Sequence, residues 1–227
     1  MPSMQLSGAK KLSDRFGFSW IFGSEEEIKK IDLSEIEPIP LSGNFNSGFA
    51  LGEYRISESA KRKRTKVGSL LHKFKYEQDR RAGELLADLA SDFIESQIPL
   101  KSTNLMLTVP PSFRSRSFDP VSFLAKRIQE RTKIQWEKDV FIRTRLTKPQ
   151  KDVRGIDAKQ LNALNTYKLA EPLKLDGKKV LLVDDVIASG ATLDEISFIL
   201  WQENTEKIFV LVLAKSICPR LDDSSIQ

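Results

Sequence analysis

Two short stretches in the last quarter of the chain each contain a continuous apolar run. Residues 178–185 read KKVLLVDD, and residues 207–215 read KIFVLVLAK. Runs of this length and composition are typical of parallel strands that are covered on both faces. NLMLTVP at 104–110 predicts another strand, and DVFIRTR at 139–145 is a further strand candidate. We therefore expect a sheet with buried central strands.

Amphipathic helices are predicted between these strands. On one face of the segment 80–97, apolar side chains recur at Leu85, Leu86, Leu89, Phe93 and Ile94. Asp119-Pro120 has the pattern of an N-cap followed by proline at the first helical position, so a helix is expected over residues 121–133. Strands that alternate with helices predict an α/β fold with a mostly parallel central sheet flanked by helices.

A further helix is expected after Asp185, beginning at about Thr192. Its apolar stripe would consist of Leu193, Ile196, Ile199 and Leu200. Thr192 and Glu195 have the spacing of a capping box, in which each side chain binds the amide of the other residue. Ligands of parallel sheets bind beyond the carboxyl ends of the strands. The segment between Asp185 and this helix is therefore the expected place for a binding site.

The first fifty residues lack such periodicity. Glycine, serine and proline residues interrupt any regular pattern there. SEEEIKKI at 24–31 predicts one short helix in an otherwise irregular segment. We expect three parts: an N-terminal extension or hood over residues 1–52, an α/β domain over residues 53–220, and a tail over residues 221–227.

The composition is that of a globular protein, with 227 residues of which 40% are hydrophobic and 30% charged. No apolar run approaches the ~20 residues that a membrane helix needs, and the N-terminus has no apolar signal region. A single cysteine, Cys218, excludes an internal disulfide and a multi-cysteine zinc site. A single histidine, His72, leaves little for histidine-based metal binding or catalysis. The expected setting is a reducing cytoplasm.

The formal net charge of +5 is unevenly distributed. Basic residues gather in the segments 61–66, 72–81, 113–118 and 143–154. A solvated basic face would explain most of these side chains. The alternative is a surface for phosphate-bearing partners, either nucleotides or nucleic acid. Charge alone does not decide between the two.

The loop Ala188-Ser189-Gly190-Ala191-Thr192 consists of small or hydroxylated residues. Gly190 and its small neighbours allow the backbone to turn tightly and to approach a ligand. The amides of the loop and of the following helix start form an anion site, most naturally for a phosphate. Ser189 and Thr192 add hydroxyl donors. A capping box would explain Thr192 without a ligand, but not the run of small residues.

Asp184 and Asp185 stand immediately before this loop. Because side chains alternate along a strand, the two carboxylates are expected to point in different directions. Carboxylates beside a phosphate need hydroxyl donors or a metal ion, and vicinal ribose hydroxyls and Mg²⁺ would supply them. The loop and the acid pair together predict a binding site for ribose 5-phosphate.

The stretch VLLVDDVIASGAT at 180–192 resembles, at every position, the 5-phosphoribosyl-1-pyrophosphate (PRPP) motif of type I phosphoribosyltransferases. The resemblance implies the fold of that family, with a small N-terminal hood that reads the acceptor. It implies that Asp184 and Asp185 hold the ribose hydroxyls and, through them, Mg²⁺, and that Ala188–Thr192 hold the 5′-phosphate. The implied reaction is displacement of pyrophosphate from ribose C1, usually by a base nitrogen.

The same resemblance implies ligands for the pyrophosphate. Val109-Pro110-Pro111 stands where phosphoribosyltransferases place a pyrophosphate loop, which makes Arg114 and Arg116 the implied ligands and the Val109–Pro110 bond a candidate for the cis isomer. Lys75 is a further candidate for the same role. A surface position is the alternative for each of these cations. No general base stands out, and Ala188 stands where some relatives carry an acid.

A finer resemblance is to the ComF group (ComFC-like competence proteins), which is associated with DNA uptake. It rests on LLHKFKYE at 70–77, TVPPSFRSRSFDPVSFLA at 108–125 and TKPQKDVRGIDAKQLNALNTY at 147–167. In the last of these, the places of a Q…R..N…F pattern are taken by Gln150, Lys159, Asn162 and Tyr167. The chain departs from the group because it lacks the N-terminal four-cysteine zinc module.

Two functions remain after this comparison. The first is a phosphoribosyltransferase that uses PRPP, Mg²⁺ and an unidentified base-like acceptor, and the intact PRPP motif favours it. The second is a non-catalytic protein of the same fold that acts in DNA uptake, repair or defence and binds single-stranded DNA or a DNA-processing protein. The missing general base favours the second. A homodimer is left open, and the absence of G-x-x-x-x-G-K-[ST] and G-x-G-x-x-G excludes P-loop and Rossmann sites.

Overall fold

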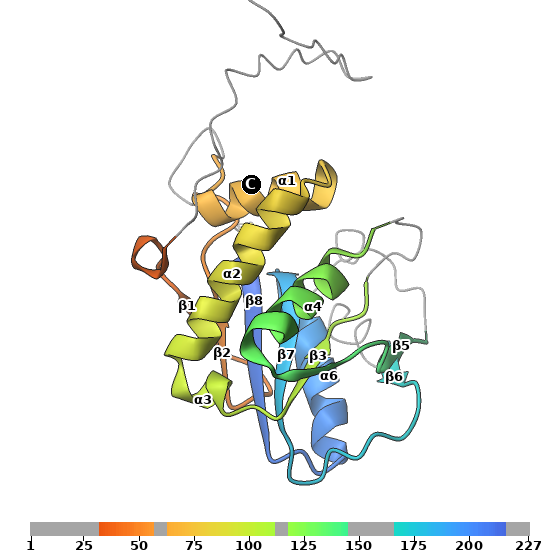
Figure 1. The fold of residues 1–227 in the computed structure, drawn as a ribbon. Helices are drawn as coiled ribbons and strands as arrows, with labels where there is room; N and C mark the ends of the chain where they lie inside the picture. Colours follow the sequence, from red (N-terminus) through yellow and green to blue (C-terminus); the bar gives the residue numbers. More distant parts are fainter. Residues whose placement is uncertain (1–31, 57–62, 112–117, 145–165, 217–227) are drawn as a thin grey trace, which may run out of the picture. The chain divides into compact units, whose positions relative to one another are not determined.

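The computed structural model of the chain describes four segments: residues 32–56, 63–111, 118–144 and 166–216 (Figure 1). The chain divides into two units, Met1–Lys30 and Ile31–Gln227, and all described residues belong to the second. The helix expected at 24–31 lies outside the described residues.

The main sheet has six strands: β1 (Ile39–Leu41), β2 (Ser47–Ala50), β3 (Leu105–Thr108), β4 (Gln135–Glu137), β7 (Lys179–Ile187) and β8 (Lys207–Lys215). Their order across the sheet is β1-β2-β8-β7-β3-β4. Neighbouring strands are parallel except β1 and β2, which are antiparallel. The mostly parallel α/β architecture predicted from the alternation of strands and helices is therefore confirmed.

β7 and β8 lie in the middle of the sheet, and each has nine residues. Their apolar segments 180–183 and 208–214 are buried throughout. This confirms that the two continuous apolar runs are central strands. β7 continues two residues beyond Asp185, to Ile187, so the acid pair lies inside the strand rather than at its end.

Helices cover both faces of this sheet (Figure 1). They are α1 (Lys66–Tyr76), α2 (Arg80–Ser96), α3 (Ile98–Lys101), α4 (Pro120–Thr132) and α6 (Ala191–Gln202), preceded by a 3-10 turn at Leu33–Glu35. α2 packs against α1 and α4, and α6 lies on the opposite face of the sheet. Among the described helices, none combines the length and the apolar composition that crossing a membrane requires.

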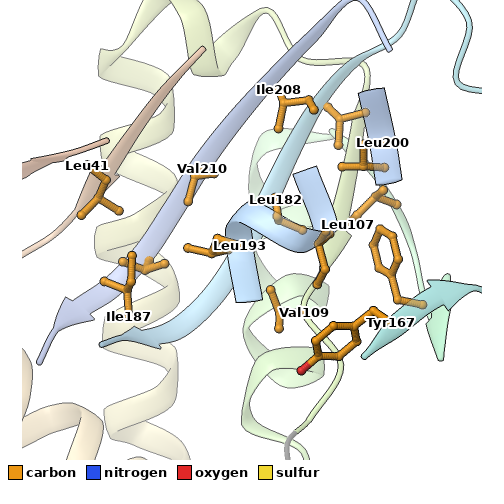
Figure 2. Close-up of a cluster of buried hydrophobic side chains, with 14 of the residues drawn as sticks. Leu41, Leu107, Val109, Tyr167, Leu182, Ile187, Leu193, Leu200, Ile208 and Val210 are labelled. Carbon is orange, nitrogen blue, oxygen red and sulfur yellow. The ribbon is translucent and has the colours of Figure 1, made fainter. Parts of the chain in front are cut away.

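The core between the sheet and α6 is built from alternate residues of the central strands. Leu193 and Leu200 of α6 pack in one cluster with Leu182 of β7 and Val210 of β8 (Figure 2). Each of these side chains is at most 1% exposed. This packing holds the start of α6, and with it the preceding loop, against the end of β7.

The start of α4 follows from its capping residue. The Asp119 carboxylate accepts hydrogen bonds from the amides of Val121 (3.1 Å) and Ser122 (3.2 Å), and Pro120 is the first helical residue. These bonds satisfy amides that the first turn of a helix leaves without a partner. The N-cap predicted at Asp119 is confirmed.

A second, smaller sheet lies apart from the first. β5 (Phe141–Arg143) and β6 (Tyr167–Leu169) form an antiparallel pair. The strand candidate at 139–145 is therefore a strand, but it does not belong to the main sheet. The two strands flank residues 145–165, which lie outside the described residues.

The segment 39–50, for which no strand was predicted, forms β1 and β2. β2 pairs with β8 along its whole length, and just before it the Asn46 side chain accepts the amide of Ile208 (2.8 Å). The latter part of the extension expected over residues 1–52 thus contributes two strands to the main sheet.

Candidate functional site

The acid pair lies on the part of β7 that continues after its pairing with β3 has ended. β3 pairs with β7 only as far as Val183, whereas β8 remains paired with β7 up to Ile187. Asp184 and Asp185 therefore extend beyond β3 at the carboxyl edge of the parallel strands. Ligands of parallel sheets bind at this edge.

The two carboxylates have different surroundings. Nζ of Lys75 on α1 lies 2.6 Å from Oδ2 of Asp185, and the two side chains are 13% and 14% exposed. Asp184 accepts the amide of Asp185 (2.7 Å) and has no cation of its own among the described residues. Burial and the neighbouring charge of Asp185 raise the pKa of Asp184 well above its usual range. An ion pair thus neutralises one carboxylate and not the other.

The loop after β7 is open to solvent, and its turn depends on a glycine. Residues 188–189 are exposed, and Gly190 has a φ of +86°, a conformation that disfavours any side chain. Gly190 is the N-cap of α6, which begins at Ala191. Within the described segments, the amides of Thr192 and Leu193 have no acceptor. The first turn of α6 therefore offers N–H groups to an anion.

The capping box predicted for Thr192 and Glu195 is wrong. α6 starts one residue earlier than expected, with Gly190 as its N-cap, and the Ser189 hydroxyl accepts the amide of Ala191 at 3.5 Å. Glu195 instead accepts the amides of Thr166 (2.5 Å) and Tyr167 (3.0 Å), which ties α6 to the start of β6. Burial raises the pKa of Glu195, although both hydrogen bonds favour its charged form. Thr192 is therefore not needed as a cap.

The anchoring of β6 on α6 was missed by the sequence analysis. The guanidinium of Arg143 on β5 donates to the hydroxyl of Tyr167 (3.1 Å) and lies over its ring, 5.4 Å from the centroid. Together with Glu195, these contacts fix the small sheet one turn along α6 from the loop. No periodicity could have revealed this, because Glu195 and its partners are 28 and 29 positions apart.

The other predicted ligands are placed only in part. Arg114 and Arg116 lie outside the described residues, and so do the ComF-like pattern positions Gln150, Lys159 and Asn162. Val109, which begins the predicted pyrophosphate segment, is buried, and its amide donates to the carbonyl of Val183 (3.2 Å). The Val109–Pro110 bond is trans, so the cis isomer considered for it is not adopted. The segment leading to Arg114 thus leaves the sheet beside the acid pair.

Mg²⁺ fits this site only together with a ligand. No three His, Cys, Asp or Glu side chains come together within the described segments as a metal-binding group. The acid pair offers two carboxylates, and one of them is already paired with Lys75. Mg²⁺ prefers six oxygens in near-ideal octahedral geometry and keeps several waters. The two carboxylates do not form such a cage. They can, however, orient hydroxyl groups of a ligand that also coordinate the ion.

Comparison with known families gave one match, over the C-terminal half of the chain. Residues 115–226 match the family model described as phosphoribosyl transferase domain. This segment contains β7, the acid pair and the loop. A comparison with curated proteins gave no match.

Several solved structures are similar to the chain at low identity. A glutamine PRPP amidotransferase from B. subtilis, complexed with ADP and GMP, is 18% identical over 58% of this chain and 26% of that chain, with a TM-score of 0.39. A hypoxanthine phosphoribosyl transferase from Trypanosoma cruzi is 12% identical over 63% of this chain and 75% of that chain (TM-score 0.41). One from Staphylococcus aureus is 10% identical over 61% and 74% (TM-score 0.39). The chain thus spans only about a quarter of the amidotransferase.

Proposed function

We propose that the protein binds PRPP at the carboxyl edge of β7, because residues 115–226 match the family model described as phosphoribosyl transferase domain and contain this edge. It transfers the phosphoribosyl group to a base-like acceptor and releases pyrophosphate. The main support is the open first turn of α6, which adjoins a shielded acid pair in a single strand–loop–helix unit. The first turn of α6 suits a phosphate, and the acid pair suits two hydroxyl groups.

In this proposal the loop holds the 5′-phosphate. Amides and hydroxyls of Ala188–Thr192 donate to the phosphate oxygens, and Gly190 brings the backbone close enough to do so. Asp184 and Asp185 accept hydrogen bonds from the vicinal ribose hydroxyls. Bound Mg²⁺ would neutralise part of the diphosphate charge and share the ribose hydroxyls.

The transfer breaks the bond between ribose C1 and the diphosphate oxygen while the acceptor nitrogen bonds to C1. The electron pair of the broken bond leaves with pyrophosphate. Because negative charge grows on the leaving group, cations that approach it lower the barrier. We assign this role to Arg114, Arg116 and Lys75. The acid pair contributes by holding the sugar in a fixed orientation.

The first test is thermal unfolding of the protein with PRPP and Mg²⁺, followed by pyrophosphate release with a panel of bases. PRPP should raise the melting temperature of the wild type, because a ligand that binds only the folded state stabilises it. Asp185→Asn should lose this rise. Asp139→Asn is the matched control: Asp139 is 82% exposed, and its φ of +57° suits asparagine. A folded wild type that does not respond to PRPP would contradict the proposal.

A non-catalytic role is the second candidate, and Ala188 favours it. The loop carries no titratable side chain at the place where some phosphoribosyltransferases have an acid. Such a protein would serve DNA uptake, repair or defence by binding single-stranded DNA or a DNA-processing protein. Stabilisation by PRPP without turnover of any base would support this role. Salt-sensitive DNA binding without a PRPP response would exclude the enzyme.

The finer assignments belong to the same proposal. We propose a ComFC-like cytoplasmic protein without the zinc module, in which the N-terminal residues form a hood that selects the acceptor. Because β1 and β2 belong to the main sheet, a deletion that tests the hood should end at residue 30. Unchanged acceptor choice and turnover after that deletion would argue against a hood. Sedimentation of the full chain would test for a homodimer.

A further inference from the structure

Lys75 and Asp185 form an ion pair that water reaches poorly on either side. Nζ and Oδ2 are 2.6 Å apart, and the side chains are 13% and 14% exposed. Asp185 is also one of the two carboxylates that we assign to the ribose hydroxyls. One of its oxygens is therefore occupied by a cation where a ligand hydroxyl would bind.

The helix that carries Lys75 is held firmly at that point. The neighbouring residue, Phe74, is fully buried, and its ring lies 5.2 Å from the rings of both Phe118 and Phe123. The backbone of Lys75 therefore stays in place when a ligand enters. Its four-carbon side chain has enough freedom to move the ammonium group to a new partner nearby.

The shielding of this pair restricts which ligand can enter. A charge that loses its partner where water is scarce is strongly disfavoured. If ribose hydroxyls displace the ammonium group of Lys75 from Asp185, the ligand itself must supply another anion. PRPP carries one on C1, next to the carbon that bears the 2′-hydroxyl. Ribose 5-phosphate has no anion at that place.

We propose that Lys75 is an exchangeable counter-ion, which pairs with Asp185 in the empty site and with the C1 diphosphate once PRPP is bound. This inference rests on the function proposed above. It makes Lys75 a specificity residue, because a sugar phosphate without the diphosphate would leave the ammonium group unpaired. The protein thereby distinguishes PRPP from ribose 5-phosphate.

The test compares the affinities of PRPP and ribose 5-phosphate for the wild type, Lys75→Met and Lys75→Arg by calorimetry with Mg²⁺ present. Lys75→Met should weaken PRPP binding by about 10- to 100-fold, the effect of one charge-assisted hydrogen bond. Ribose 5-phosphate should bind Lys75→Met at least as well as the wild type. Lys75→Arg keeps the charge and should retain most of the preference for PRPP. Equal losses for both ligands would overturn the inference.

A second measurement separates exchange from a purely structural ion pair. Asp185→Asn leaves Lys75 without its carboxylate, so inorganic pyrophosphate should bind this variant several-fold more tightly than the wild type. Unchanged or weaker pyrophosphate binding would contradict the exchange. Circular dichroism and the double variant Lys75→Met/Asp185→Asn, which removes both charges, check that the fold is retained. A wild type that binds neither sugar phosphate would refute the proposed function itself.

Discussion

Two sets of ion pairs in this protein have equal distances and different surroundings. Between α2 and α4, Arg131 lies 2.6 Å from both Asp88 and Asp92, and these side chains are between 29% and 42% exposed. At the carboxyl edge of the sheet, Lys75 lies 2.6 Å from Asp185, with both side chains less than 15% exposed. Access to water, rather than distance, distinguishes the two sets.

The difference in exposure has energetic and functional consequences. In the exposed set, water and salt screen the charges, so each pair contributes little to stability. In the shielded set, neither charge is well solvated alone, so each depends on the other. A shielded pair at the open edge of a parallel sheet is therefore suited to exchanging one partner for a ligand, whereas the exposed pairs accompany the packing of two helices.

The largest expected effect is on the shielded pair. Lys75→Met leaves Asp185 without a partner and should lower the free energy of unfolding by about 3 kcal/mol, measured by urea denaturation. Lys75→Met combined with Asp185→Leu should recover most of this loss, because no charge then remains unpaired. If the single variant loses no more stability than variants of the exposed set, the two sets do not differ as described.

The second prediction separates backbone strain from ligand binding at the same edge. Gly190→Ala should lower the free energy of unfolding by about 1 kcal/mol, because the φ of +86° disfavours alanine. Gly177→Ala is the matched control, with a φ of +65° and open space around the site of a Cβ. Both variants should lose similar stability in urea. Stabilisation by PRPP should fall only in Gly190→Ala. An equal fall in both variants would show that the loop does not take part in binding PRPP.

The third prediction concerns Asp184, which is shielded and forms no ion pair with any residue of the described segments. Its pKa is raised by burial and by the charge of Asp185, so the folded state binds the proton more tightly than the unfolded state. Wild-type stability should therefore fall as pH rises from about 4, the ordinary aspartate value, through the raised value. Asp184→Asn should be more stable than the wild type at pH 7, by the order of 1 kcal/mol. Urea titrations across pH should show this advantage vanish in acid, and a pH-independent difference would contradict the assignment.

The smallest effect is expected in the exposed set. Asp88→Asn removes one of two carboxylates beside Arg131 and should change the free energy of unfolding by less than about 0.5 kcal/mol. The change should shrink further in high salt, because screening already weakens the pair. A loss of several kcal/mol in urea denaturation would show that exposure does not govern the strength of these pairs.

Local patterns predicted a large part of the fold. The apolar runs that became β7 and β8, and the Asp119 cap of α4, depend on residues within a few positions of one another. α1 could have been predicted in the same way, because Val67, Leu70, Leu71 and Phe74 have helical spacing and are buried. β1 and β2 were harder to predict, because they are only three and four residues long and contain proline and glycine.

The loop that we propose as the phosphate site stands out in the sequence because its chemistry is contiguous: an acidic strand, small residues and a helix start follow one another in the chain. Folding decided which distant side chains meet this loop. Asp185 pairs with the ammonium group of Lys75, whereas Asp184 forms no ion pair with a described residue. Glu195 binds the start of β6 instead of forming the expected cap. Such contacts depend on how helices and strands pack in three dimensions, and neither periodicity nor spacing along the chain records that packing.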